Sequence, residues 1–307
     1  MKKCSKCKRE AIYFRINEGR YYCEKCFSEN IEKRVKSVIS KYKLVSKKDK
    51  IAVALSGGKD SSNTVYLLKK IFGKNPNVDI VAITVDEGIK GYRNKVVKGC
   101  KKFCDELGVE HYLVSFKERF NLTVDEIGEK TKDEGTCGPC GILRRYLLNE
   151  KARELKAKKI AVGHNLDDEA QSVIMNFMKG DLIRLARFGA LPGIKVHSKF
   201  IPRIKPLLLV PEKESALHAL INHIPAYFVE CPYAKFNSLR RETRDFLNRL
   251  ENRSPGIKYS IIKSAERVAS LLKAELKFGE INSCSNCGEP CSGDLCKTCE
   301  TMKTFFG

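Results

Sequence analysis

The sequence contains no run of 18 or more apolar residues, so we expect no membrane-spanning helix. Its first residues, Met-Lys-Lys-Cys-Ser, lack the apolar segment of a secretory signal, so we expect the protein in the cytoplasm. Acidic residues are scarce, with 37 Asp and Glu against 58 Lys and Arg and a formal net charge of +21. This excess favours a polyanionic partner, nucleic acid first, although a solvated basic surface would have the same composition. A chain of 307 residues is expected to form more than one domain.

Disulfides are not expected in a reducing compartment, so the 14 cysteines are better explained as metal ligands or catalytic thiols. Eight of them form two quartets of Cys-x2-Cys pairs, namely Cys4, Cys7, Cys23 and Cys26, and Cys284, Cys287, Cys296 and Cys299. The pairs are fifteen residues apart in the first quartet and eight in the second, which fits tetrahedral zinc sites. Such short segments bury too little apolar surface to fold alone, so the metal would supply the folding energy. We interpret both as structural Zn²⁺ sites, with rubredoxin-like iron as the alternative at the first.

A glycine-rich turn follows the apolar run of residues 51–55 and precedes the helical spacing of residues 65–71. A strand, a tight turn and a helix start form an anion site, because free backbone N–H groups and the helix dipole face the anion. The turn lacks both the G-x-x-x-x-G-K-[ST] and the G-x-G-x-x-G patterns. Residues 56–61 read Ser-Gly-Gly-Lys-Asp-Ser, which resembles the SGGxDS loop of the PP-loop ATP pyrophosphatases. A purely structural glycine turn is the simpler alternative.

Polar residues follow two further expected strands. Residues 79–86 form one apolar run that ends in Asp86 and Glu87, and residues 160–163 form another before Asp167 and Asp168. In doubly wound sheets ligands bind at the carboxyl ends of the strands. The acids after residue 163 either cap the next helix or hold Mg²⁺ at a bound triphosphate. His164 is either a core histidine or a side chain that faces the ligand.

Six cysteines lie outside both quartets. Cys100 and Cys104 are expected to be packing thiols, and Cys291 has no assigned partner in the second quartet, whereas the other three allow two interpretations. Cys137 and Cys140 form a Cys-x2-Cys pair before a helix, and Cys231 follows far downstream. The pair is either a redox dithiol or part of a metal site with Cys231 as third ligand. Three thiolates on a [4Fe–4S] cluster would leave one iron open for a ligand such as sulfide. Spacing alone does not decide between the two.

The chain as a whole resembles the tRNA 2-thiouridine synthetases of the TtuA/NcsA type. The resemblance rests on residues 56–61, on Gly-His-Asn-Leu-Asp-Asp at 163–168, on the three separate cysteines and on a quartet at each end. It implies that an oxygen-sensitive [4Fe–4S] cluster is held by Cys137, Cys140 and Cys231. It implies that ATP is bound by Ala54, Ser56, Gly57, Gly58, Asp60, Ser61, Val85, Gly163 and Asp168. It also implies catalytic roles for Asp60, Asp167 and Arg144, with Arg145 as the alternative to Arg144.

The second half of the chain carries the expected tRNA-binding surface. Residues 179–213, which include Lys205, hold eight Lys and Arg against two acids, and residues 235–273 hold ten against four. Such surfaces neutralise phosphates, and aromatic side chains between the cations stack on an extruded base. For any single arginine, a solvated helix face is the simpler explanation.

These observations predict an α/β protein with a Rossmann-like PP-loop parallel sheet flanked by two zinc ribbons. The predicted divisions are a zinc finger at 1–30, a linking helix at 31–49, the catalytic domain at 50–275 and a zinc ribbon at 276–307. The expected reaction adenylates the C2 oxygen of a tRNA uridine with ATP and Mg²⁺, after which sulfide displaces AMP. Sulfide or a ubiquitin-like carrier would donate the sulfur, and a homodimer is expected. The alternatives are a PP-loop ligase that uses a nitrogen nucleophile and a non-enzymatic zinc-ribbon RNA-binding protein.

Overall fold

The computed structural model describes residues 2–132, 135–191, 197–227, 231–236, 238–276 and 279–306. Within that part of the chain, no helix is both long enough and apolar enough to cross a membrane.

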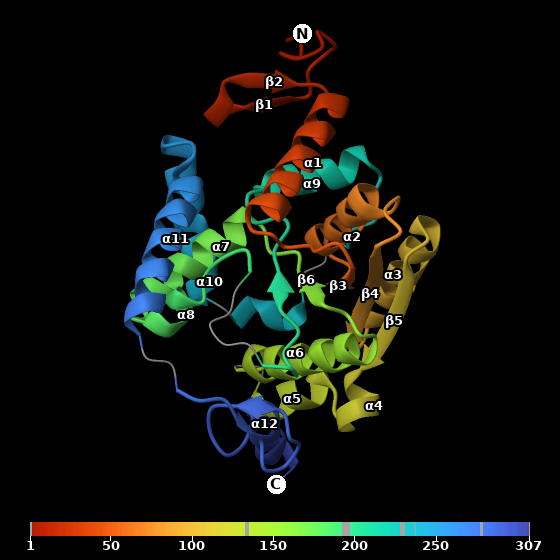
Figure 1. The fold of residues 1–307 in the computed structure, drawn as a ribbon, viewed down its shortest axis with the longest axis vertical. Helices are drawn as coiled ribbons and strands as arrows, with labels where there is room; N and C mark the ends of the chain where they lie inside the picture. Colours follow the sequence, from red (N-terminus) through yellow and green to blue (C-terminus); the bar gives the residue numbers. More distant parts are fainter. Residues whose placement is uncertain are drawn as a thin grey trace.

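A five-stranded parallel sheet forms the centre of the molecule, in the order β5-β4-β3-β6-β7 (Figure 1). The strands are β3 (Asp49–Ala54), β4 (Val78–Asp86), β5 (Glu110–Ser115), β6 (Lys159–Ala161) and β7 (Arg203–Ile204). Strands β3 and β4 are nearly continuous apolar runs, as expected for parallel strands that are covered on both faces. Because all five strands are parallel, their carboxyl ends and the loops after them meet at one edge of the sheet.

Helices cover both faces of this sheet (Figure 1). Its side chains alternate between two apolar cores, so that Ile51 and Val53 of β3 face one and Ala52 faces the other. The helices are α1 (Glu24–Lys41), α2 (Lys59–Phe72), α3 (Arg93–Leu107), α4 (Phe116–Phe120), α5 (Val124–Thr131), α6 (Cys137–Glu154), α7 (Leu166–Met178), α8 (Leu182–Ala186), α9 (Glu212–Ile221), α10 (Ser238–Arg253), α11 (Ile257–Glu275) and α12 (Lys297–Phe306). The first core contains side chains of α1, α2 and α3, and the second contains those of α5, α6 and α12.

The N-terminal quartet belongs to a small module that shares the first core. Its hairpin pairs β1 (Tyr13–Arg15) with β2 (Arg20–Tyr22), followed by α1; the 3-10 helix η1 (Ile16–Glu18) forms the turn. Buried Glu214, in the first turn of α9, pairs with Arg15 of β1 and Arg34 of α1. Arg15 is only 2% exposed, so this carboxylate compensates an otherwise buried charge. The linking helix that was expected at residues 31–49 is α1. It already starts at Glu24 and ends at Lys41, so Cys26 of the quartet lies in its first turn.

The C-terminal quartet lies at the other end of the molecule (Figure 1). Its module contains the short hairpin of β8 (Asn282–Ser283) and β9 (Pro290–Cys291), followed by α12. Arg153 of α6 donates to Glu289 over 2.6 Å, and Lys199 Nζ donates to the Gly288 carbonyl over 2.5 Å. The prediction of an α/β fold with a parallel sheet and a cysteine quartet at each end is confirmed.

Candidate active site

The turn between β3 and α2 is closed by its own serines. Ser61 Oγ donates to the Gly58 carbonyl over 2.9 Å and accepts from the Ser56 N–H over 3.2 Å. Gly58 is the N-cap of α2, and no side chain caps that helix. The helix therefore begins with backbone N–H groups that no capping side chain satisfies, which is the arrangement that binds phosphates.

Two glycines allow the backbone to pack tightly around this turn. Gly57 has a φ of +88°, and a Cβ there would lie 2.4 Å from Cγ1 of Val96. A Cβ on Gly163, in the loop after β6, would lie 2.7 Å from the backbone nitrogen of Ser61 and 2.8 Å from the carbonyl carbon of Asp60. The loops after β3 and β6 are thus in direct backbone contact, so residues 163–168 form a second wall of the same site.

Two carboxylates meet where these loops touch. Asp60 Oδ2 lies 3.0 Å from Lys59 Nζ, whereas Asp60 Oδ1 is buried without a hydrogen-bond partner among the described residues. Burial raises the pKa of Asp168, and the nearby Asp60 carboxylate adds to the rise although His164 opposes it. A buried, unpartnered oxygen next to a second carboxyl group fits the oxygen ligands that Mg²⁺ takes in proteins.

Asp167 has different contacts. Its buried carboxylate pairs with Lys258 of α11 and accepts the Glu212 N–H over 2.7 Å. Its own N–H and that of Asp168 donate to Oδ1 of the N-cap residue Asn165, and Asp168 Oδ2 accepts the Asn165 N–H over 3.2 Å, so of the two acids it is Asp168 that has the predicted capping role. The contacts of Asp167 join α7 to α9 and α11, and its catalytic role stays a prediction.

A chain of polar contacts leads from the nucleotide loop towards the separate cysteines; its middle members, Arg93 and Glu87, are buried, whereas Ser56 and Arg144 at its ends are exposed. Arg93 donates to the Ser56 carbonyl over 3.0 Å and also to the Val85 carbonyl at the end of β4. Its Nε lies 2.7 Å from Glu87 Oε2, and Glu87 Oε1 lies 3.5 Å from Nη1 of Arg144. No sequence pattern indicated a role for Arg93. Only the position of Glu87 at the end of a strand pointed to this chain of contacts.

The three separate cysteines lie near one another, and Arg144 lies near two of them, Cys140 and Cys231. Cys137 and Cys140 begin α6, and Cys140 and Cys231 pack against the same apolar core. Cys231 precedes the 3-10 helix η2 (Pro232–Phe236), and Cys137 Sγ lies 3.6 Å from the Tyr233 carbonyl. Burial raises the pKa of Cys140 to about 12, and Arg144 opposes that rise.

The spacing of these three sulfurs differs from that in the quartets. Among the described residues, only the two quartets form groups whose ligand atoms all lie within 4.8 Å of one another. Four sulfurs around one zinc stand about 3.8 Å apart, from Zn–S bonds of about 2.3 Å in a tetrahedron. A wider trio does not fit a single zinc ion, whereas a four-iron cluster is larger and takes ligands that stand further apart.

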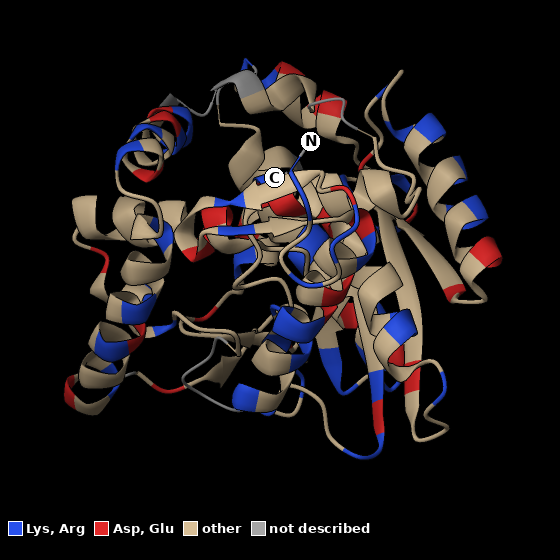
Figure 2. Ribbon diagram, turned by 90° about the horizontal axis from the view of Figure 1, so that it is seen from above, with Lys and Arg blue, Asp and Glu red and all other residues tan. Residues whose placement is uncertain are grey.

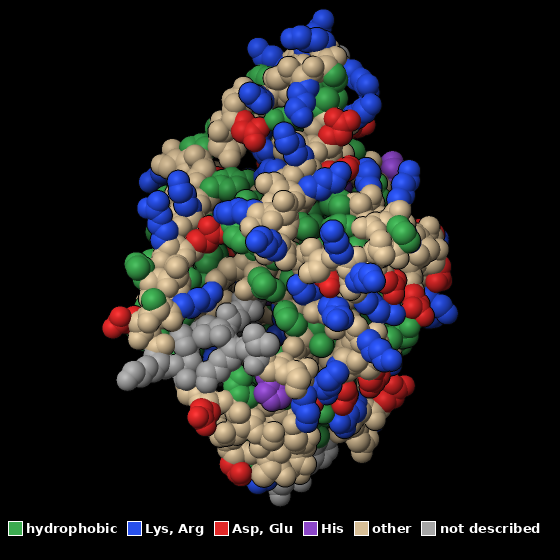
Figure 3. Space-filling model, viewed as in Figure 1, with side chains coloured by type: hydrophobic (Ala, Val, Ile, Leu, Met, Phe, Trp, Pro, Cys, Tyr) green, Lys and Arg blue, Asp and Glu red, His purple; other side chains and the backbone are tan. Residues whose placement is uncertain are grey.

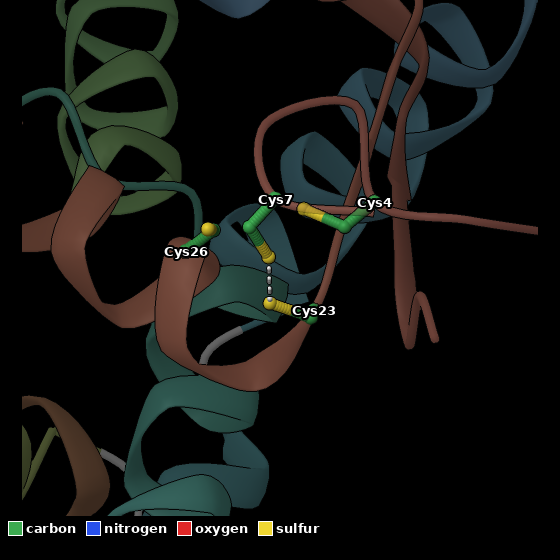
Figure 4. A group of neighbouring side chains, drawn as sticks. All are labelled: Cys4, Cys7, Cys23 and Cys26. Atoms are coloured by element: carbon green, nitrogen blue, oxygen red, sulfur yellow. Dashed lines mark hydrogen bonds between the residues drawn. The ribbon is translucent and has the colours of Figure 1, made fainter. Parts of the chain in front are cut away.

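Both quartets match the geometry of a closed metal site. In the first, Cys7 Sγ and Cys23 Sγ are 3.4 Å apart, and the four side chains come from the loop before β1 and from the start of α1 (Figure 4). In the second, the sulfurs of Cys287 and Cys296 are 3.5 Å apart. These separations are those expected of ligands to one tetrahedral ion.

On the face drawn in Figure 3, basic side chains are more numerous than acidic ones, and the ribbon in Figure 2 has Lys and Arg positions spread over many of its helices. The expectation that the cations of residues 179–213 form a phosphate-binding surface is wrong for Lys205, which is buried and pairs with Glu169 over 2.7 Å. Lys258, in the second basic segment, is likewise buried against Asp167. Both stabilise acids at the start of α7 and are not available to nucleic acid.

Known proteins are similar to this chain in both sequence and fold. The PP-loop domain family matches residues 27–241. The tRNA 2-thiolation protein NcsA of Haloferax volcanii is 36% identical, with 98% of each chain covered. The tRNA-5-methyluridine(54) 2-sulfurtransferase of Pyrococcus horikoshii is also 36% identical, with 97% of this chain and 93% of that protein covered.

A solved structure extends the similarity to three dimensions. The U34-tRNA thiolase NcsA from Methanococcus maripaludis, determined with its [4Fe-4S] cluster, superposes with a TM-score of 0.86. It is 37% identical, and the match covers 98% of this chain and 96% of that one. With a phosphate-binding loop, three gathered cysteines and a quartet at each end, this chain belongs to the NcsA-type tRNA 2-thiolation proteins of the PP-loop family.

Proposed function

We propose that this protein is an ATP-dependent tRNA 2-sulfurtransferase that replaces the C2 oxygen of a tRNA uridine by sulfur. Nearly full-length similarity to NcsA-type thiolases supports this function. The observation that carries it is the chain of contacts Ser56–Arg93–Glu87–Arg144, buried at Arg93 and Glu87, which leads from the nucleotide loop to the separate cysteines. A nucleotide site and a sulfur site that share one network suit a reaction that needs both in one cavity.

In this proposal the loop residues bind the triphosphate. Backbone N–H groups at the start of α2 take its phosphates, while Ser56 and Ser61 keep the turn closed. Asp60 and Asp168 would hold Mg²⁺, which would supply positive charge to the triphosphate. The uridine oxygen attacks the α-phosphate, and pyrophosphate leaves. Ala54, Val85 and Gly163 form the apolar and backbone walls of the same site, and Asp167 orients the start of α7 through Lys258.

We assign Cys137, Cys140 and Cys231 as ligands of a [4Fe–4S] cluster. When bound, the cluster supplies an iron without a protein ligand, to which sulfide can bind. Arg144, held by Glu87, places a permanent positive charge beside these cysteines, where it attracts anionic sulfur to the activated uridine. The attack of sulfide on the adenylated carbon then releases AMP.

The remaining assignments follow from the same proposal. The two quartets bind structural Zn²⁺, because four thiolates at these separations close the coordination of one ion. Sulfur comes from sulfide or from a ubiquitin-like carrier protein, and the working unit is a homodimer in the cytoplasm.

The test is a thiolation assay under anaerobic conditions with unmodified tRNA, ATP, Mg²⁺ and sulfide. Nucleoside mass spectrometry is expected to detect 2-thiouridine or its 5-methyl derivative, with about one AMP released for each sulfur inserted. Positions 34 and 54 are both mapped, since thiolases named for each are equally similar to this chain. A Cys231→Ser variant should lose product while binding ATP normally. Full activity in a Cys137→Ala/Cys140→Ala/Cys231→Ala variant would favour the nitrogen-using ligase, and absence of ATP consumption would favour the RNA-binding protein.

A further inference from the structure

A polar pocket lies between α7, α8 and α10, which are side by side in Figure 1. It encloses about 340 Å³. Seven side chains line it, namely Ser172, Met175, Asn176, Lys179, Arg184, Leu239 and Arg240. Three of the seven are cations and none is an acid. Arg184 also pairs with Asp181 over 3.2 Å and Arg240 with Asp168 over 3.8 Å, so the surroundings of the pocket keep a smaller net positive charge, which still suits an anionic ligand.

One wall of the pocket reaches the nucleotide site. Arg240 Nη1 lies 3.8 Å from Asp168 Oδ1 and 3.4 Å from Gln171 Oε1. Ser172 lies one turn of α7 after Asp168 and donates its hydroxyl to the Asp168 carbonyl over 2.8 Å. A ligand in the pocket would therefore lie directly beside the carboxylates that we assign to Mg²⁺.

The other wall leads towards the separate cysteines through further arginines. Arg203 Nη2 lies 3.4 Å from the carbonyl oxygen of Arg145, to which it donates. Neither guanidinium has an ion pair with an acid in the described part of the chain. Burial lowers the pKa of Arg145, and the charges of Arg144 and Arg184 lower it further. These cations repel one another, so an anion that lay among them would be bound favourably.

The charges and the contents of the pocket indicate one kind of ligand. A row of cations starts at Arg240, which lies beside Asp168, and continues through the pocket to Arg145, which lies near Cys140. The phosphates of an RNA strand could follow this row from the nucleotide site to the separate cysteines. The pocket also offers Met175 and Leu239 as apolar faces, together with the polar side chain of Asn176. Phosphate contacts combined with an apolar face are what single-stranded RNA requires.

We propose that this pocket binds one nucleotide of the tRNA strand next to the target uridine. Lys179 and Arg184 contact its phosphate, its base lies against Met175 and Leu239, and the strand continues along Arg145 and Arg203 towards the cysteines. The inference rests on the proposed function, since it names where the RNA substrate of that reaction lies.

The experiment compares tRNA binding by wild-type protein and by a Lys179→Glu/Arg184→Glu variant across a range of salt concentrations. Affinity should fall at least tenfold, and the slope of log K against log salt should decrease by about two, one for each lost phosphate contact. The affinity for ATP without tRNA should stay within twofold. If the variant does not fold, Lys179→Gln/Arg184→Gln is measured instead. The slope should again decrease by about two because both phosphate contacts are lost, and the loss of affinity should be smaller because no negative charge is added.

The matched control is Lys101→Glu/Lys102→Glu, which makes the same change in net charge at exposed positions of α3. In Figure 1, α3 and α10 lie on opposite sides of the molecule. Equal losses in the two variants would mean that only net charge matters and would overturn the pocket proposal, as would a selective loss of ATP affinity. Failure of the wild-type protein to bind tRNA would instead contradict the proposed function itself.

Discussion

A methyl group on Gly163 should damage the nucleotide site without unfolding the protein. The Cβ of Gly163→Ala would lie 2.7 Å from the backbone nitrogen of Ser61 and 2.8 Å from the carbonyl carbon of Asp60. Relief to 3.4 Å, the lower limit of ordinary contact, requires a shift of 0.7 Å (3.4 minus 2.7). The crowded atoms are backbone atoms in the first turn of α2 and cannot rotate away, so the nucleotide loop itself has to move.

Overpacking of this kind costs about 1–3 kcal/mol. If the strain displaces the phosphate-binding N–H groups, ATP affinity should fall about 5- to 150-fold, at about 1.4 kcal/mol for each factor of ten. Isothermal titration calorimetry with ATP and Mg²⁺ measures this loss. Gly293→Ala is the control, because a Cβ there meets nothing within 4 Å. A folded Gly163→Ala protein whose ATP affinity lies within twofold of wild type would refute the assignment of this loop to ATP.

Three further substitutions test other parts of the structure. Glu214→Ala should lower the free energy of unfolding by about 3–5 kcal/mol because it leaves buried Arg15 unpaired, whereas exposed Glu129→Ala should have little effect in the same urea titration. Burial lowers the pKa of His218 to about 4, so its contribution to stability is complete above pH 6.5 and is lost as the pH falls towards 4. In urea titrations, the free energy of unfolding of the wild type should fall by about 2 kcal/mol between pH 7 and pH 5, and this fall should be smaller in His218→Gln. Glu87→Gln should slow sulfur insertion while ATP affinity stays within threefold, because it weakens the anchor of Arg144; an unchanged single-turnover rate would contradict this.

The local parts of the site could be predicted from the sequence because short-range patterns determine them. The apolar run before the Ser-Gly-Gly-Lys-Asp-Ser turn forms β3, and α2 begins at Lys59, inside that turn. The Cys-x2-Cys pairs specify both quartets, because each pair places two sulfurs on one small loop. Cys100 and Cys104, expected as packing thiols, are both buried.

No short-range sequence pattern indicated the contacts between segments that are far apart in the chain. Lys258 reaches Asp167 across 91 residues, and a lysine in a basic segment is more simply explained as a surface charge. The sequence likewise does not distinguish Asp167 from Asp168; only the fold turns the first towards α11 and the second towards Asp60. The sequence also predicts a helix only after Cys140, whereas α6 already starts at Cys137 and includes Gly138 and Pro139; proline is well tolerated in the first turn of a helix.

The central claim is that Cys137, Cys140 and Cys231 hold an iron–sulfur cluster that serves the ATP-dependent reaction. Its most direct test is iron, sulfide and zinc analysis of protein purified without oxygen, with absorption spectra recorded on the same samples. The account predicts about four irons and two zincs for each chain in the wild type, and loss of iron but not of zinc in the Cys137→Ser/Cys140→Ser/Cys231→Ser variant. A colourless, iron-free wild-type protein that still converts tRNA uridine to 2-thiouridine would contradict it.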